Sequence, residues 1–276
     1  MKKRLLLFTL IYITLTSYSQ NIFTNNKKQN KGYEITGEII GLQDSSVMLA
    51  YYFGGKQYAT DTAEVINGKF TFKGKKKLEG GMYLVVLKNQ SYFNIIISEQ
   101  EFSFHTNIND LRGSMKFKNS EENVPFYEYL NFITSMQKEI TPIRQALESA
   151  KGEKKKELEK KTKEIDKKVK QYSSDFMNNY ADKFFSKIVK ANTEIEIPEA
   201  PLDSNGNPNK TFPYHYYKKH FWDNIDFSDE RMLRTPIFYN KMDQYLTKLT
   251  AKHPDSINVS ADILVEKAKA NKKIFQ

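Results

Sequence analysis

The sequence predicts an α+β protein, with an N-terminal antiparallel β-sandwich or small barrel followed by an α-helical domain. Two observations lead to this order. Along residues 33–106 apolar residues alternate between recurring turn residues, which is typical of short strands. After residue 126 they fall three and four positions apart, as on one face of a helix. The polar stretch 117–126 separates the two patterns.

These patterns divide the chain into four segments. We assign a signal peptide to 1–19, a flexible lead-in to 20–32, a β-sandwich-like domain to 33–115 and a helical domain to 116–276. Of the 276 residues, 39% are hydrophobic and 13% are aromatic, which is enough to build a core and argues against disorder.

The first 19 residues have the pattern of a secretory signal. Basic residues precede an apolar run from Leu5 to Leu15, and Ser17 and Ser19 place small side chains before a cleavage site at Gln20. An uncleaved anchor is the alternative, but the run is short for a membrane span. We expect an exported protein, periplasmic or envelope-associated, that is soluble and keeps no integral membrane segment after cleavage.

Seven or eight short strands are expected before residue 107. The strongest local signal is Asn67-Gly68, because this pair supplies the positive φ angles that a two-residue hairpin turn needs. Gly80-Gly81 marks another turn. The expected strands are Tyr33–Ile39, Val47–Tyr52, Thr60–Ile66, Lys69–Phe72, Met82–Leu87, Tyr92–Ile97 and Glu101–Thr106.

The helical region begins with Ser120-Glu121-Glu122-Asn123, a polar and acidic start of the kind that helices favour. A first helix follows, which Pro142 is expected to kink or restart. A narrow apolar stripe from Leu158 to Phe176 predicts a second helix, packed as in an antiparallel hairpin. Further on, Ser228-Asp229-Glu230 starts a helix, and His253-Pro254 delays the last helix to Ser260.

Positive charge gathers in one segment of the chain. The formal net charge is +10, and between Lys151 and Lys170 there are 10 lysines against 5 acidic residues. The two signs are interleaved, which favours a solvated helix face with pairs at i,i+4 over a nucleic-acid or membrane-surface site. We therefore expect no nucleic-acid partner.

Several motifs on both sides of the division resemble a known family. The chain resembles the N-terminal portion of exported thioredoxin-like, thiol–disulfide-interchange proteins of Gram-negative bacteria. In that family a β domain of unknown function and a helical segment precede a redoxin domain. The resemblance lies in Tyr33-x-Ile35-x-Gly37-x-Ile39, Asp61-Thr62, Asn67-Gly68-Lys69-Phe70-x-Phe72-x-Gly74, Gly81-x-Tyr83, Phe117-x-Asn119-Ser120-Glu121-Glu122-Asn123, the run from His220 to Arg231, and Arg234-Thr235-Pro236.

The chain departs from that family in its chemistry. The family's redox motif is a Cys-x-x-Cys on the redoxin domain, whereas this sequence contains no cysteine. It is therefore either a shortened relative or an N-terminal fragment of a longer product. The disulfide chemistry cannot be transferred, and as it stands we do not expect the chain to be an enzyme.

Candidate sites are few. The four histidines lack the cysteine and carboxylate partners of a zinc site, and Asp203–Gly206 lacks the further ligands of a calcium loop. We predict no catalytic, cofactor or metal residues. Four side chains could form a peptide or carbohydrate surface, although packing in the helical core is the favoured interpretation of them: Tyr214, Tyr217, His220 and Trp222.

The sequence thus favours a non-catalytic accessory module that binds a protein partner or positions a redox domain, in the same chain or in another. The alternative is an envelope ligand-binding protein that uses the aromatic surface. Phe117 and Phe126 are the expected apolar anchors on either side of the junction between the two domains.

Overall fold

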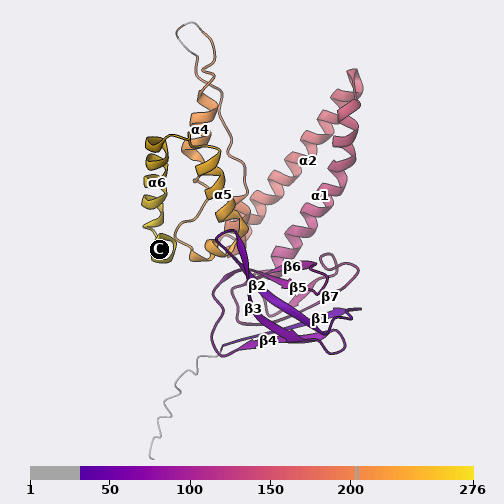
Figure 1. The fold of residues 1–276 in the computed structure, drawn as a ribbon. Helices are drawn as coiled ribbons and strands as arrows, with labels where there is room; N and C mark the ends of the chain where they lie inside the picture. The colour runs from indigo at the N-terminus through magenta and orange to yellow at the C-terminus, as the bar shows by residue number, and fades with distance from the viewer. Residues whose placement is uncertain (1–31, 203, 205) are drawn as a thin grey trace, which may run out of the picture.

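The computed structural model describes residues 32–202, 204 and 206–276. The predicted signal peptide and all but the last residue of the predicted lead-in lie outside these residues. The described chain forms two layers of β-sheet, from which a long helical hairpin extends, with shorter helices beside it (Figure 1). Every helix in this part of the chain is too short or too polar to span a bilayer.

The β region is a sandwich of two four-stranded sheets, not a closed barrel. One sheet has the order β4-β1-β7-β8 and the other β3-β2-β5-β6. The prediction of a β-sandwich is therefore confirmed. The strands are β1 (Tyr33–Ile40), β2 (Ser46–Phe53), β3 (Lys56–Glu64), β4 (Lys69–Gly74), β5 (Gly81–Val86), β6 (Tyr92–Ile97), β7 (Glu101–Asn107) and β8 (Lys116–Lys118).

Two details of strand pairing differ from the sequence-based expectation. β1 runs parallel to β7, with Ile35 beside Phe102, inside otherwise antiparallel sheets. Asn67 and Gly68 do have the expected positive φ angles of 51° and 76°. Ile66 and Lys69 exchange two backbone hydrogen bonds across this turn, at 2.9 and 3.0 Å, as expected for a two-residue hairpin. The pairing ends there, because β3 pairs with β2 and β4 pairs with β1. The turn is a corner at which the chain passes from one sheet to the other.

Helices occupy the rest of the described chain. They are α1 (Asn123–Ser149), α2 (Gly152–Asn179), α3 (Phe184–Ala191), α4 (Phe212–His220), the 3₁₀-helix η1 (Glu230–Arg234), α5 (Pro236–Thr247), α6 (Pro254–Ala268) and α7 (Lys272–Phe275). The α+β class is thus confirmed. The last strand, β8, lies entirely after residue 115, which we took as the end of the β domain.

The α1–α2 hairpin is present, but α1 does not restart at Pro142, and α6 begins earlier than the predicted Ser260. α1 continues through Pro142, which costs one backbone hydrogen bond, while the buried Ile140 holds that part of the helix against α2. α6 begins at Pro254 and not at Ser260, because proline fits the first position of a helix. Ser260 is buried within the helix and shares a hydrogen bond with Thr250.

A single hydrophobic core joins the two regions. Phe104 of β7 contacts Phe117 at 5.9 Å between ring centroids, and Phe117 contacts Tyr127 of α1 at 5.0 Å. Phe126 in turn contacts Phe185 of α3 at 4.9 Å. The two predicted anchors therefore do lie in the junction, in a chain of aromatic contacts that runs from the sheets into the helices.

Candidate functional site

The first contact between the two regions is made by the start of α1. Asn123 is fully buried, and its side-chain amide bonds both backbone groups of Ile96: Oδ1 accepts from the N–H and Nδ2 donates to the C=O, each at 2.7 Å. Because β6 is an edge strand, these groups have no strand partner on that side. Tyr127 adds a bond from its hydroxyl to the carbonyl of Asn94, at 2.8 Å.

The acidic pair before α1 serves a different helix from the one we expected. Glu122 is buried, and its carboxylate accepts from the backbone N–H groups of Phe184 and Phe185, at 2.8 and 3.0 Å. These are the first residues of α3, so the carboxylate satisfies donors that would otherwise be unpaired. Glu121 is exposed and pairs with Lys183 at 2.6 Å.

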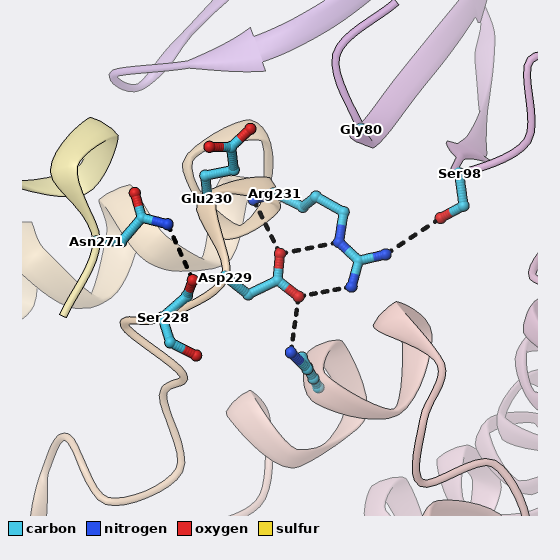
Figure 2. A pocket seen from close by; sticks show the side chains of 8 residues that line it. Gly80, Ser98, Ser228, Asp229, Glu230, Arg231 and Asn271 are labelled. Atoms are coloured by element: carbon cyan, nitrogen blue, oxygen red, sulfur yellow. Dashed lines mark hydrogen bonds and ion pairs between the residues drawn. The ribbon is translucent and has the colours of Figure 1, made fainter.

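Arg231 of η1 is the centre of a charged cluster at the junction. Its guanidinium donates to both carboxylate oxygens of Asp229, at 2.8 and 2.6 Å, and to the hydroxyl of Ser98 at 3.3 Å. Figure 2 shows Arg231 between Asp229 and Ser98, which reaches it from the sheet region. The guanidinium carbon lies 4.5 Å from the ring centroid of Phe184, and Lys187 donates to Asp229 at 2.8 Å.

The charges in this cluster are mutually satisfied. Burial by itself would raise the pKa of Asp229, but hydrogen bonds from Arg231 and Lys187 outweigh it and lower that pKa to about 2. Lys187 also pairs with Asp226 at 2.7 Å. A bidentate arginine–carboxylate pair with additional donors fixes geometry more than it offers a site for a ligand. We therefore assign this cluster to the junction and not to catalysis.

Gly80 and Gly81 allow η1 to approach the sheet. A Cβ atom on Gly81, whose φ is +146°, would lie 2.4 Å from the Cβ of Arg234. A Cβ atom on Gly80 would lie 2.8 Å from the Cδ of Arg231. Both distances are shorter than side chains tolerate. The sequence signalled only a turn here, whereas the glycines also provide the space in which η1 packs on β5.

The four aromatic candidates do not form one exposed surface. Trp222 is 2% exposed and packs on Tyr245 at 5.2 Å, within the helical core. Tyr217 is half-buried against Phe221, at 5.6 Å. Tyr214 is 44% exposed, and its hydroxyl donates to the carbonyl of Leu249.

His220, the fourth candidate, belongs to a separate group of side chains. Its ring lies 4.2 Å from that of Tyr216, one helical turn away, and its Nδ1 is 2.6 Å from a carboxylate oxygen of Asp223. Among the described residues, no three His, Cys, Asp or Glu side chains are arranged to hold a metal ion. The loop considered for calcium includes positions 203 and 205, outside the described residues.

Several exposed apolar side chains lie on α6, which the sequence analysis did not single out. Ser260 and Leu264 face the body of the protein, but the positions on both sides of this line are also apolar. Val259 and Ile263 are 59% and 39% exposed on one side, and Ile257 and Val265 are 46% and 47% exposed on the other. Large exposed apolar areas often mark contacts with other proteins.

Comparisons with known proteins divide the chain near the same place. Residues 33–126 match a family model described as a domain of unknown function (DUF4369), and residues 146–276 match a second, also described as a domain of unknown function (DUF5106). No curated protein and no solved structure matches the chain. The chain therefore contains two domains of unknown function, one that covers the sandwich and one that covers most of the helical region.

Proposed function

We propose that the chain is a non-catalytic accessory module of an exported thiol–disulfide-oxidoreductase-like protein, which positions a redox domain or binds a protein partner. The signal pattern at residues 1–19 and the family resemblance support this assignment. The chain has no cysteine, so the thiols of any disulfide exchange would belong to the bound domain. The module would supply placement and not chemistry.

The observation that carries the proposal is the exposed apolar surface of α6. Val259 and Ile263 lie four positions apart, so their side chains are neighbours on the helix. Ile257 and Val265 are further exposed apolar side chains on the other side of the line that packs inward. Burial of such side chains contributes about 1.5–3 kcal/mol each, so a partner that covers α6 would gain appreciable affinity from them.

The fixed position of this region relative to the sandwich also supports a positioning role. Asn271, which caps α7 just after α6, donates to the carbonyl of Ser228 at 2.9 Å. Lys273 pairs with Glu79 at 3.1 Å and with Glu230 at 2.8 Å. Bonds from one short segment to η1 and to the turn before β5 would hold a domain bound at α6 in a defined orientation.

A binding measurement tests the proposal. The chain over residues 20–276 is titrated by calorimetry with a purified thioredoxin-like domain that carries Cys-x-x-Cys, taken from a longer protein of the family that the sequence resembles. We expect saturable binding that is lost when Val259 and Ile263 are both replaced by Asp. A matched variant, Asn258→Asp with Ala270→Asp, adds the same charge at exposed positions outside the apolar surface and should bind normally.

Two outcomes of this experiment would contradict different parts of the proposal. Equal affinity of both double variants would exclude α6 as the contact surface, and an absence of binding by the unmodified chain would contradict the positioning role itself. The alternative function, ligand binding by the four aromatic side chains, has less support because Trp222 is buried and His220 is engaged with Asp223.

A further inference from the structure

A groove in the helical region contains a lysine that lacks an acidic partner. Lys241 of α5 is partly buried, and its Nζ lies 4.7 Å from the ring centroid of Phe221. Throughout the described residues no carboxylate comes within ion-pair distance of this ammonium group. Burial lowers the pKa of Lys241. The charge is therefore held where a bound anionic group would compensate for lost hydration.

The side chains beside Lys241 are suited to an amide-containing ligand. Asn240, Lys241 and Gln244 lie together on α5 and line one wall of the groove, with Ile237 one turn before them. Asn and Gln side chains each offer both a donor and an acceptor, as a peptide group does. Tyr217 of α4 lines the same groove and adds an aromatic surface.

The opposite wall is an extended segment with free backbone groups. The chain between α3 and α4 runs beside α5 (Figure 1), and Glu194, Ile195 and Ile197 line the groove. The N–H and C=O groups of residues 194–197 make no backbone hydrogen bond with any described residue. An extended, unpaired segment of this kind can accept a further strand.

Contacts on the far side hold this segment in place. The carbonyl of Thr193 accepts from Asn224 at 3.2 Å, and Glu196 pairs with Lys170 of α2 at 2.8 Å. Side chains alternate along an extended chain, so Ile195 and Ile197 lie on the opposite side from Glu196. The two isoleucines thus supply apolar contacts within the groove, while the arm formed by α1 and α2 braces the segment from behind.

We propose that this groove binds an extended peptide that carries a carboxylate, with the peptide backbone paired to residues 194–197 and the carboxylate at the Lys241 ammonium group. The inference does not depend on the proposed function, because it involves neither α6 nor a redox domain. The carboxylate could be the C-terminus of the peptide or an acidic side chain, and both present the same group to the lysine.

The test begins with phage that display random heptapeptides with free C-termini. They are selected in parallel on the unmodified protein and on the Lys241→Met variant, in which the side chain keeps its length but loses its charge. We expect peptides with a carboxylate at a fixed position to be enriched on the unmodified protein alone. The absence of any sequence enriched over the Lys241→Met selection would overturn the proposal.

A selected peptide is then synthesised with a fluorescent label, and its affinity is measured by polarisation. Its Kd should rise about tenfold or more in Lys241→Met, as expected for a lost charge-assisted hydrogen bond, and should stay unchanged in the matched variant Lys248→Met. Ile197→Asp, at a side chain that is 42% exposed, tests the other wall without disturbing the core and should also weaken binding. Equal affinity in Lys241→Met and Lys248→Met would refute the site.

An amidated peptide distinguishes the two carboxylate sources. If the C-terminus binds Lys241, amidation should weaken binding as much as Lys241→Met does. If an acidic side chain binds, amidation should have no effect, and replacement of that residue by its amide should weaken binding instead. If neither the amidated peptide nor the peptide with the replaced acidic residue binds more weakly, no carboxylate of the peptide pairs with Lys241.

Discussion

Asn123 pairs with Ile96 as a residue of a neighbouring strand would, although Asn123 begins the helix α1. The side-chain amide of Asn123 replaces a backbone partner on the free edge of β6, with both hydrogen bonds at 2.7 Å. The pairing covers an edge that would otherwise expose backbone groups. It also fixes where α1 leaves the sandwich, and with it the position of the helical region.

Replacement of Asn123 by Ala should destabilise the protein by about 2–5 kcal/mol, because the N–H and C=O of Ile96 would be left buried without partners. Chemical denaturation by urea measures this directly. Asn258→Ala, at an exposed position of α6, is the control and should change the free energy of unfolding by less than about 0.5 kcal/mol. Similar losses in both variants would contradict the structural role of Asn123.

Gly81→Ala should be costly because the added methyl group would meet Arg234 and because φ is +146°. We expect a loss of about 1–3 kcal/mol in the free energy of unfolding. Gly54→Ala offers a comparison, since Gly54 also has a positive φ, +55°, but nothing lies within 4 Å of its added Cβ. That variant should lose about 1 kcal/mol, because only the left-handed backbone opposes the added methyl group. If it is the more damaging of the two, η1 does not pack against Gly81 as described.

The stability of the junction should depend on pH through Asp229. Its pKa is lowered from the ordinary 3.8 to about 2 in the folded protein. The carboxylate therefore adds stability above roughly pH 4, and this contribution disappears as the pH falls through the folded pKa near 2. Thermal melts of Asp229→Asn should show lower stability at neutral pH, with the difference from the unmodified protein shrinking below about pH 4. A constant difference across this range would argue against the ion pairs.

Trp222 should matter for folding and not for a surface contact. Trp222→Ala is expected to cost about 3–5 kcal/mol, because a large side chain would leave a cavity in the core. Tyr214→Phe removes one hydroxyl at a partly exposed position and should cost about 1 kcal/mol or less. Circular dichroism melts of the two variants separate these effects, and a fully stable Trp222→Ala protein would contradict the burial of the indole.

Local pattern predicted the elements of this fold better than their connections. Alternation identified the strands, helical spacing identified α1 and α2, and the aromatic residues Phe117 and Phe126 lie at the junction as expected. The parallel pairing of β1 with β7 was missed because alternation says which face a residue occupies but not which strand lies beside it. Turn chemistry at Asn67-Gly68 likewise predicted the backbone angles and the bridge between Ile66 and Lys69, but not the strands with which β3 and β4 pair.

The candidate sites were harder to predict because they depend on residues far apart in the chain. Glu122 caps a helix that begins 62 residues later, and Arg231 reaches Ser98 across 133 residues. Nothing in the sequence singles out Lys241, since its lack of an acidic partner depends on tertiary packing. Local signals were present at the acidic pair 121–122 and at the double glycine 80–81, but they were interpreted as a helix start and as a turn.

The bonds at Asn123 and Arg231 should hold the helical region rigidly on the sandwich, and a distance measurement tests this most directly. Because the chain has no cysteine, spin labels can be placed cleanly at Thr36→Cys on β1 and Asn258→Cys on α6. Double electron–electron resonance should give one narrow distribution of distances between the two labels. This distribution should broaden when Asn123→Ala and Asp229→Asn are added together. A broad or multi-peaked distribution in the otherwise unmodified protein would contradict a fixed junction, and with it the proposed positioning role.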